Sequence, residues 1–311
     1  MSDKTKTFFK RLFSTVILLS LLGGAVAWNN VIGYGVLLCL FCNLTTWEWF
    51  VMLKETPACR KLGLVMGLVY PWTLFSVLQA ESPDLIVSSA SQCLALGYLV
   101  LFALLAFFVN LFCMDYKGRT GREALESMGL TLLSFVYPVW LFAFALNWVV
   151  VDNFMPHSGK VWVLLWLILF TKMSDIWAYV SGVLLGGRFF TRKFSPTVSP
   201  KKTWEGIIGS FILTLTAGWF LLQVLCPGEP VDCLYFLGYL LFGSILFVLS
   251  VAGDLAGSLI KRGLAVKDSG SLLPGIGGIF DLIDSPAFTV SFCIVVCPAL
   301  GELLVRVLFS L

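Results

Sequence analysis

The chain has 311 residues, of which 59% are hydrophobic and only 13% are charged, and its formal net charge is +3. Its mean hydropathy of +0.93 and its recurring apolar runs of roughly 20 residues exclude a soluble globular protein and predict an all-α, polytopic integral membrane protein. The small positive charge indicates a basic rim suited to anionic lipid head groups, and it gives no reason to expect nucleic acid as a partner.

Nine apolar segments are long enough to cross the ~30 Å hydrocarbon layer of a bilayer as helices. The first follows a cluster of lysines and is interpreted as a signal anchor, because a second apolar segment comes almost at once. The predicted spans are 12–28, 31–53, 62–80, 93–113, 128–150, 160–183, 206–226, 235–260 and 286–310. Nearly all the unusual polar residues lie in the second half, so we divide the chain into packing helices over 1–150 and a catalytic region over 151–311.

Basic residues are distributed unevenly between the connections that join these spans. If the N-terminus is cytosolic, every Lys and Arg except Lys160, Lys172 and Arg306 falls on the cytosolic side, while the opposite connections carry acidic residues. The positive-inside rule therefore predicts a cytosolic N-terminus and a C-terminus on the outer side. The single histidine, His157, lies in an outer connection, which excludes histidine-based chemistry on the cytosolic side.

The sixth predicted span contains the segment LFTKMSDIWAYVSGVLLGGR, which includes Lys172 and Asp175. A rise of ~1.5 Å per residue puts Asp175 in the cytosolic third of the membrane, where an ionised group is costly and is by default functional. Asp175 and Tyr179 share a helical face with Ala178 and Gly182, so we expect an acid and a phenol beside space for a ligand. The alternative is that Lys172 and Asp175 only neutralise each other.

The segment SPKKTWEG begins at Ser199 and lies between the sixth and seventh spans. Ser199 followed by Pro200 predicts the N-cap and the first residue of a helix. Lys201 and Lys202 would then lie in the first turn, next to unpaired backbone N–H groups, which is a good place to bind phosphate. The alternative is that they are ordinary lysines of a cytosolic connection.

Asp254 lies at the cytosolic edge of the eighth span and shares a helical face with Gly257, Ser258 and Lys261. An acid, a hydroxyl and an amine are therefore expected along one groove. Two further basic residues, Arg262 and Lys267, follow the end of this span.

A glycine-rich segment comes next, and its glycines allow close backbone approach and exposed N–H groups at Gly275, Gly277 and Gly278. Asp281 and Asp284 follow, three positions apart on one face of an expected helix. Carboxylates without His or Cys favour a hard cation such as Mg²⁺. We therefore predict Asp254 and Asp281 as metal ligands, with Asp284 as a further ligand or a supporting residue.

Together these motifs resemble the signature of the phosphatidate cytidylyltransferase family. The resemblance rests on SLIKR at 258–262, KDSG at 267–270, PGIGG at 274–278 and DLIDS at 281–285, with SPKKTWEG upstream. It is sharpest over residues 170–290. The family usually has His where Ile276 stands and Arg where Leu282 stands, and both departures leave the acids intact.

The resemblance implies that CTP and phosphatidate react to give CDP-diacylglycerol and pyrophosphate, with Mg²⁺ and room for a second, monovalent cation. It also implies a homodimer, to which the packing helices over 1–150 would contribute, in the cell (inner) membrane with a cytosolic active site. The expected catalytic residues are Lys201, Lys202, Asp254, Asp281 and Asp284. The expected substrate-binding residues are Asp175, Tyr179, Ser199, Ser258, Lys261, Arg262, Lys267, Gly275, Gly277 and Gly278.

Two other functions remain open. A CTP-dependent enzyme that acts on another lipid, such as a polyprenol kinase or another lipid-phosphate cytidylyltransferase, would keep the acids and change the lipid groove. A cation or proton transporter also uses intramembrane Asp and Lys, but its pathway must reach both membrane faces. Here every acid of interest lies in the cytosolic third or at the cytosolic edge, which favours an enzyme.

Overall fold

The computed structural model describes residues 30–80, 89–118, 120–146, 159–225, 233–274 and 277–293, together with positions 13, 16, 17, 20, 21 and 24. Within these residues, seven helices are long and apolar enough to cross a membrane, and they match the second to the eighth predicted spans. Most of the first predicted span and most of the ninth lie outside the described residues. The polytopic, helical membrane architecture is confirmed.

The chain forms two compact units. The first comprises Met1–Val151 and Leu264–Ile283, and the second comprises Asp152–Gly263 and Asp284–Leu311. The segment 264–283, which we expected within the C-terminal catalytic region, thus packs with the N-terminal helices. It carries the glycine-rich motif and Asp281.

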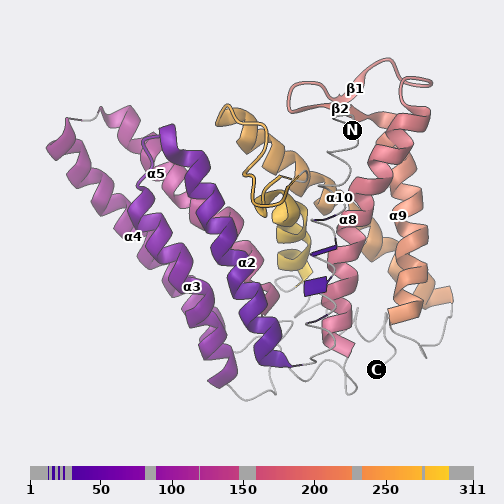
Figure 1. Ribbon diagram of the computed structural model, residues 1–311, viewed down its shortest axis with the longest axis horizontal. Coiled ribbons are helices and arrows are strands. Elements are labelled where there is room, and N and C mark those ends of the chain that lie inside the picture. The colour runs from indigo at the N-terminus through magenta and orange to yellow at the C-terminus, as the bar shows by residue number, and fades with distance from the viewer. Residues whose placement is uncertain are drawn as a thin grey trace. The chain divides into compact units, whose positions relative to one another are not determined.

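The first unit consists of helices that lie alongside one another (Figure 1). Their bounds are α2 (Val31–Met52), η1 (Leu53–Glu55), α3 (Arg60–Ala80), α4 (Ser89–Lys117), α5 (Gly121–Phe135), η2 (Val136–Trp140) and α6 (Leu141–Ala143). The ring of Phe135 is buried and packs on Tyr70 and Phe102, with ring centroids 5.3 and 4.8 Å away. Helix α5 begins seven residues before the predicted span because Thr120 and Glu123 form a capping box at its start.

The second unit contains α8 (Gly159–Leu185), β1 (Lys193–Ser195), β2 (Ser199–Thr203), α9 (Trp204–Leu225) and α10 (Cys233–Gly263). Residues 284–293 continue a helix that starts at Phe280. The indole Nε1 of Trp166 on α8 donates to the Gly218 carbonyl on α9 (2.9 Å), and the Tyr239 hydroxyl on α10 donates to the Leu215 carbonyl (2.6 Å). These bonds tie the three helices together where an unpaired polar group in lipid would be costly.

The prediction that a helix starts at Ser199 is wrong. Residues Ser199–Thr203 form β2, which pairs antiparallel with β1, so that Lys193 lies opposite Thr203. Helix α9 starts at Trp204, where the Thr203 hydroxyl accepts a hydrogen bond from the Gly206 N–H (3.1 Å) and supplies the cap. A Ser-Pro pair is compatible with a short edge strand as well as with a helix start, because proline at an edge loses no ladder bond.

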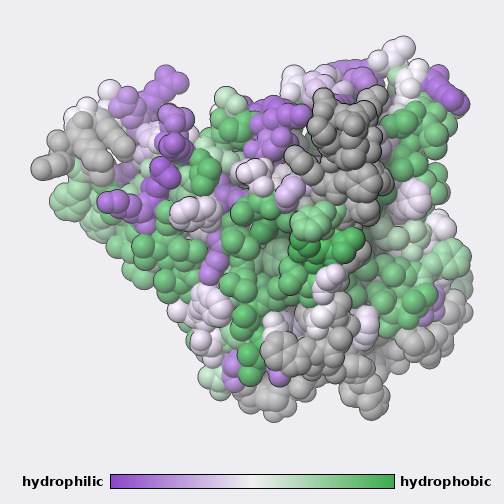
Figure 2. All heavy atoms as spheres, in the orientation of Figure 1, coloured by the Kyte–Doolittle hydropathy of each residue, from purple (hydrophilic) through white to green (hydrophobic). Residues whose placement is uncertain are grey.

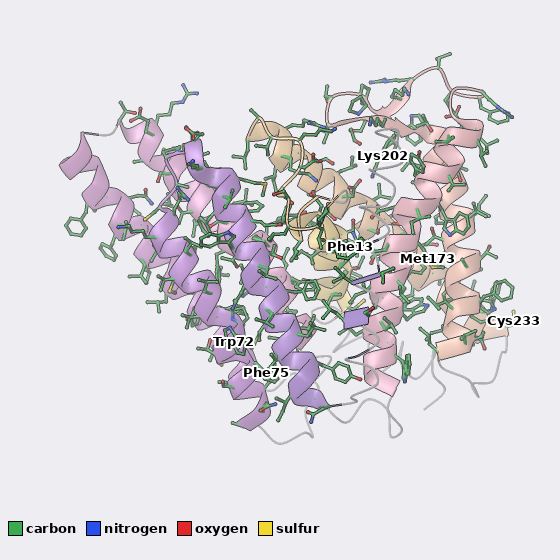
Figure 3. The ribbon with its side chains drawn as sticks, in the orientation of Figure 1. Phe13, Trp72, Phe75, Met173, Lys202 and Cys233 are labelled. Atoms are coloured by element: carbon green, nitrogen blue, oxygen red, sulfur yellow. The ribbon has the colours of Figure 1, made fainter. Side chains whose placement is uncertain are left out.

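Hydrophobic side chains cover the middle of the helices, and hydrophilic ones gather around the β1–β2 hairpin of the second unit (Figure 2). On α4, for example, the side chains of Leu96, Val100, Leu104 and Phe112 are about half or more exposed. A row of exposed apolar residues on a long helix is typical of a lipid-facing surface. In the second unit, Lys202 and Cys233 mark opposite ends of the helices (Figure 3).

Candidate active site

Lys172 on α8 lies between two carboxylates of the second unit. Its Nζ is 3.5 Å from Asp175 Oδ2, one helical turn further along α8, and 3.5 Å from Asp284 Oδ1. The Asp284 side chain is only 4% exposed. Lys172 and Asp175 therefore do form the i,i+3 pair considered above, but Lys172 also joins α8 to the helix that follows the glycine-rich motif.

Lys202 on β2 forms an ion pair with Asp254 on α10. Successive side chains of a strand point to opposite sides, so Lys201 is exposed while Lys202 is turned toward the helices. The strand thus separates two neighbouring lysines that a helical first turn would have kept together. Of these two lysines, only Lys202 contacts a carboxylate among the described residues.

Two glycines let α10 approach Asp284 closely. A Cβ added at Gly253 would lie 2.8 Å from the Asp284 carbonyl oxygen, and one at Gly257 would lie 3.0 Å from Asp284 Oδ2. Asp284 therefore packs directly against α10, the helix that carries Asp254, and its other neighbour Lys172 also contacts Asp175. We call Lys172, Asp175, Lys202, Asp254 and Asp284 the aspartate–lysine cluster.

The cluster suits a hard cation in its chemistry, because its acidic donors are all carboxylate oxygens. In the part of the chain that the structure describes, however, no three His, Cys, Asp or Glu side chains converge as a metal site. Lysine ammonium groups contact all three carboxylates instead. A cation at Asp254 would therefore require Lys202 to move away.

Asp281 belongs to the first unit and organises the glycine-rich motif. Its Oδ2 accepts hydrogen bonds from the Ser269 hydroxyl (2.8 Å), the Ser269 N–H (3.2 Å) and the Gly278 N–H (3.0 Å). Gly277 has φ +128, a conformation that side chains rarely adopt, and a Cβ there would lie 2.7 Å from Asp281 Oδ2. The predicted residue Gly275, like Ile276, lies outside the described residues.

Glu48 on α2 was not among the predicted site residues, yet it contacts this motif. Glu48 is 2% exposed, and its Oε2 accepts a hydrogen bond from the Phe280 N–H (2.9 Å). The Ser269 hydroxyl oxygen lies 3.5 Å from the same carboxylate oxygen, but its proton is donated to Asp281. Its Oε1 has no hydrogen-bond partner among the described residues. An acidic residue inside an apolar span is a signal for function, and that signal was available in the segment TTWEWF.

Part of the space expected beside Ala178 and Gly182 is occupied by α9. A Cβ added to Gly206 of α9 would lie 2.9 Å from the Ala178 carbonyl oxygen and 3.2 Å from Gly182 Cα, so these small residues serve close packing of α8 on α9. Tyr179 is 74% exposed. Among the remaining predicted residues, Ser199, Ser258 and Lys261 are partly exposed, and Arg262 and Lys267 are exposed.

A model of the Cytidylyltransferase family matches residues 9–300. A phosphatidate cytidylyltransferase from Mycobacterium bovis is 41% identical over 130 residues, which cover 42% of this chain and 39% of the relative. One from Haemophilus influenzae is 38% identical over 138 residues, or 44% of this chain and 46% of the relative. One from Helicobacter pylori is 35% identical over 192 residues, or 62% and 63% of the two chains. In each case the chain spans less than two thirds of the relative's length.

Proposed function

Because this chain belongs to the cytidylyltransferase family, we propose that it transfers the cytidylyl group of CTP to phosphatidate. The products would be CDP-diacylglycerol, for phospholipid synthesis, and pyrophosphate. The relatives named phosphatidate cytidylyltransferase support this choice of substrates. The apolar helices suit an enzyme whose lipid substrate is dissolved in a membrane.

The aspartate–lysine cluster is the observation that carries the proposal. Phosphatidate already presents a phosphate oxygen as the nucleophile, so the reaction requires no strong general base. It does require that two polyanions be neutralised and aligned. A cluster of carboxylates and ammonium groups on the family motifs offers both functions, since lysines pair with phosphates and carboxylates bind a divalent cation.

Lys202 and Lys201 are the proposed phosphate contacts. Lys202 would exchange Asp254 for a CTP phosphate, which frees the Asp254 carboxylate for a cation. Asp254, Asp281 and Asp284 remain the proposed Mg²⁺ ligands, and the bound ion would neutralise the CTP phosphates and the leaving pyrophosphate. A second, monovalent cation stays a prediction.

Lys172 would hold the carboxylates of Asp175 and Asp284 in a fixed orientation, because its ammonium group contacts both. The other predicted contacts keep their roles as candidates for the nucleotide or the lipid phosphate. These are Asp175, Tyr179, Ser199, Ser258, Lys261, Arg262, Lys267, Gly275, Gly277 and Gly278.

Nine spans, a cytosolic N-terminus and an outer C-terminus are proposed as the topology, in the cell (inner) membrane, with a cytosolic active site. The distribution of basic residues supports this orientation. So does the separation of the lysine-bearing hairpin from Cys233 at the other end of the second unit's helices (Figure 3). A homodimer is proposed from the family resemblance.

The direct test is incubation of the purified protein with Mg²⁺, phosphatidate and CTP labelled at the α-phosphate or, in parallel, at the γ-phosphate, followed by thin-layer separation of the lipids. We expect labelled CDP-diacylglycerol from the unsubstituted protein and none from Asp254→Asn. Parallel reactions contain a polyprenol or a polyprenyl phosphate, and a vesicle assay measures ion flux. Label in a polyprenyl product only, or flux without CTP turnover, would replace the proposal with one of the alternatives.

A further inference from the structure

The connection between α8 and α9, residues 186–203, is held at one face of the membrane by its two ends. It follows the span Trp162–Leu185 and precedes the span Trp204–Leu225. Its sequence GGRFFTRKFSPTVSPKKT contains five basic residues and no acidic one. Arg188, Arg192 and Lys193 are exposed and belong neither to the predicted site nor to the aspartate–lysine cluster.

Aromatic side chains accompany these basic residues. Phe189 is 76% exposed, Phe190 46% and Trp204 39%. The Trp204 ring lies between two phenylalanines, 6.3 Å from the Phe190 ring centroid and 4.8 Å from that of Phe194. Exposed aromatic rings next to basic side chains are typical of the boundary between membrane and water.

Glu205 fixes the backbone that carries the two exposed phenylalanines. Its Oε1 accepts hydrogen bonds from the N–H groups of Phe189 (3.0 Å) and Phe190 (2.9 Å), and its side chain is buried. Gly187, with φ +79, makes the turn out of α8 that precedes them. The exposure of Phe189 and Phe190 is therefore imposed by ordered backbone.

We propose that residues 186–204, the basic–aromatic hairpin, bind anionic phospholipids of the bilayer in which the protein lies. Arg188, Arg192 and Lys193 would contact the head groups, while Phe189, Phe190 and Trp204 enter the boundary with the acyl chains. This surface would act on any anionic phospholipid and does not depend on the proposed reaction.

Charge argues against a second copy of the chain as the occupant. In a two-fold symmetric contact the same patch meets itself, so the four exposed basic residues Arg188, Arg192, Lys193 and Lys201 would face the same four residues, and the connection itself supplies no acid. An anionic lipid surface instead attracts each basic side chain and accepts the aromatic rings.

The test places a photoreactive p-benzoylphenylalanine at Phe189 in liposomes of equal parts phosphatidylglycerol and phosphatidylcholine. The masses of the lipid adducts are then measured. The control carries the same probe at Phe220, which is 65% exposed on α9 and lies within residues 203–260, a segment without Lys or Arg. At low salt we expect the ratio of phosphatidylglycerol to phosphatidylcholine adducts at residue 189 to be about five times the control ratio. One basic residue near an anionic lipid surface contributes ~1 kcal/mol, which corresponds to about this enrichment.

In about 1 M salt, where the screening length falls to ~3 Å, the enrichment should shrink toward the control ratio. The phosphatidylglycerol enrichment should be absent, even at low salt, from the triple variant Arg188→Gln, Arg192→Gln, Lys193→Gln. Equal ratios at the two probes, crosslinks between protein chains, or the absence of lipid adducts at residue 189 would each overturn the proposal. The salt dependence is measured on the chain with its native charges, so the result holds even if the triple variant does not fold.

Discussion

Glu48 on α2 accepts a hydrogen bond from the backbone N–H of Phe280, 232 residues further along the chain, with 2.9 Å between the nitrogen and Oε2. The Ser269 hydroxyl lies beside the same carboxylate and donates to Asp281 Oδ2. The ring of Phe280 packs on Trp49, with centroids 5.2 Å apart. One side chain of α2 thus fixes both the end of the glycine-rich motif and the start of the helix that carries Asp281.

Replacing Glu48 should separate this positioning role from simple packing. Glu48→Ala leaves the buried Phe280 N–H without its acceptor, which costs about 1–3 kcal/mol, and turnover of CTP should fall about 10–100-fold as it does when supporting residues are lost. Glu48→Gln keeps a carbonyl acceptor and should retain most activity and stability. Melting temperature and CTP turnover are measured, with exposed Glu55→Gln as control. Wild-type turnover in Glu48→Ala would show that the motif does not depend on α2.

Lys172 and Asp284 should prove strongly coupled. Lys172→Met leaves two carboxylates without their shared cation, and breaking a buried pair in this way costs about 3–5 kcal/mol. The double variant Lys172→Met, Asp284→Asn should be more stable than Lys172→Met alone, because it removes one of those charges. A double-mutant cycle of unfolding in detergent measures the coupling, with exposed Lys54→Met as control. Additive effects would mean that the pair contributes nothing to stability.

Asp254→Asn and Asp281→Asn should each abolish CTP turnover without preventing membrane insertion. Each change removes the charge of one proposed metal ligand with little change in volume. Turnover is measured over a range of Mg²⁺ concentrations, and Glu126→Gln on the exposed surface of α5 serves as control. The metal assignment fails if either variant keeps more than about a tenth of the activity, because even supporting residues cost about 10–100-fold.

Gly277→Val should be far more damaging than a glycine change in open space. A β-branched residue does not adopt φ +128, and its Cβ would press on the Asp281 carboxylate, 2.7 Å away. We expect loss of CTP turnover and a lower melting temperature. Gly129→Ala on α5, where nothing lies within 4 Å of the added Cβ, should leave both unchanged or slightly raise stability. If Gly277→Val has normal turnover, the loop is a passive connector.

The two ends of the second unit should be reached from opposite sides of the membrane. A cysteine introduced by Ser195→Cys in β1 should react with an impermeant maleimide only from the cytosol, and the native exposed Cys233 only from outside. Labelling of oriented vesicles, resolved by mass spectrometry of peptides, makes the comparison. Cys233→Ser identifies the outer signal. Labelling of both positions from one side would refute the proposed topology.

The spans were predictable because a bilayer imposes a length and an apolar composition that the sequence displays directly. The predicted segment 31–53 became the span Val31–Glu55, and 62–80 became Arg60–Ala80. The β1–β2 hairpin was missed because Ser199 and Pro200 fit a strand edge as well as a helix start, and only pairing with Lys193–Ser195 decides between them. In the same way, the sequence of α8 shows that Ala178 and Gly182 are small, but it does not show that Gly206 of α9 packs against them.

The candidate acids were recognisable because they stand in motifs, whereas their partners are distant in the sequence. Asp284 was predicted, but its contact with Lys172 crosses from α8 to the last described helix. Glu48 stands alone in an apolar span, and its link to Phe280 is a tertiary contact. Charge and spacing in the sequence thus indicate the candidate site residues, while the fold determines which of them are in contact.

The distance along the chain between Glu48 and Phe280 also has a consequence for biosynthesis. Helix α2 leaves the ribosome long before the residue whose N–H its carboxylate accepts. At about 5–20 residues per second, the 232 intervening residues take about 10 to 50 s to make. During that interval Glu48 cannot have its final partner, and a nascent chain that stops before Phe280 never supplies it. Premature termination before the codon for Phe280 would therefore leave an acidic side chain in an apolar helix without its acceptor role filled, a defect open to recognition by quality-control proteases of the membrane.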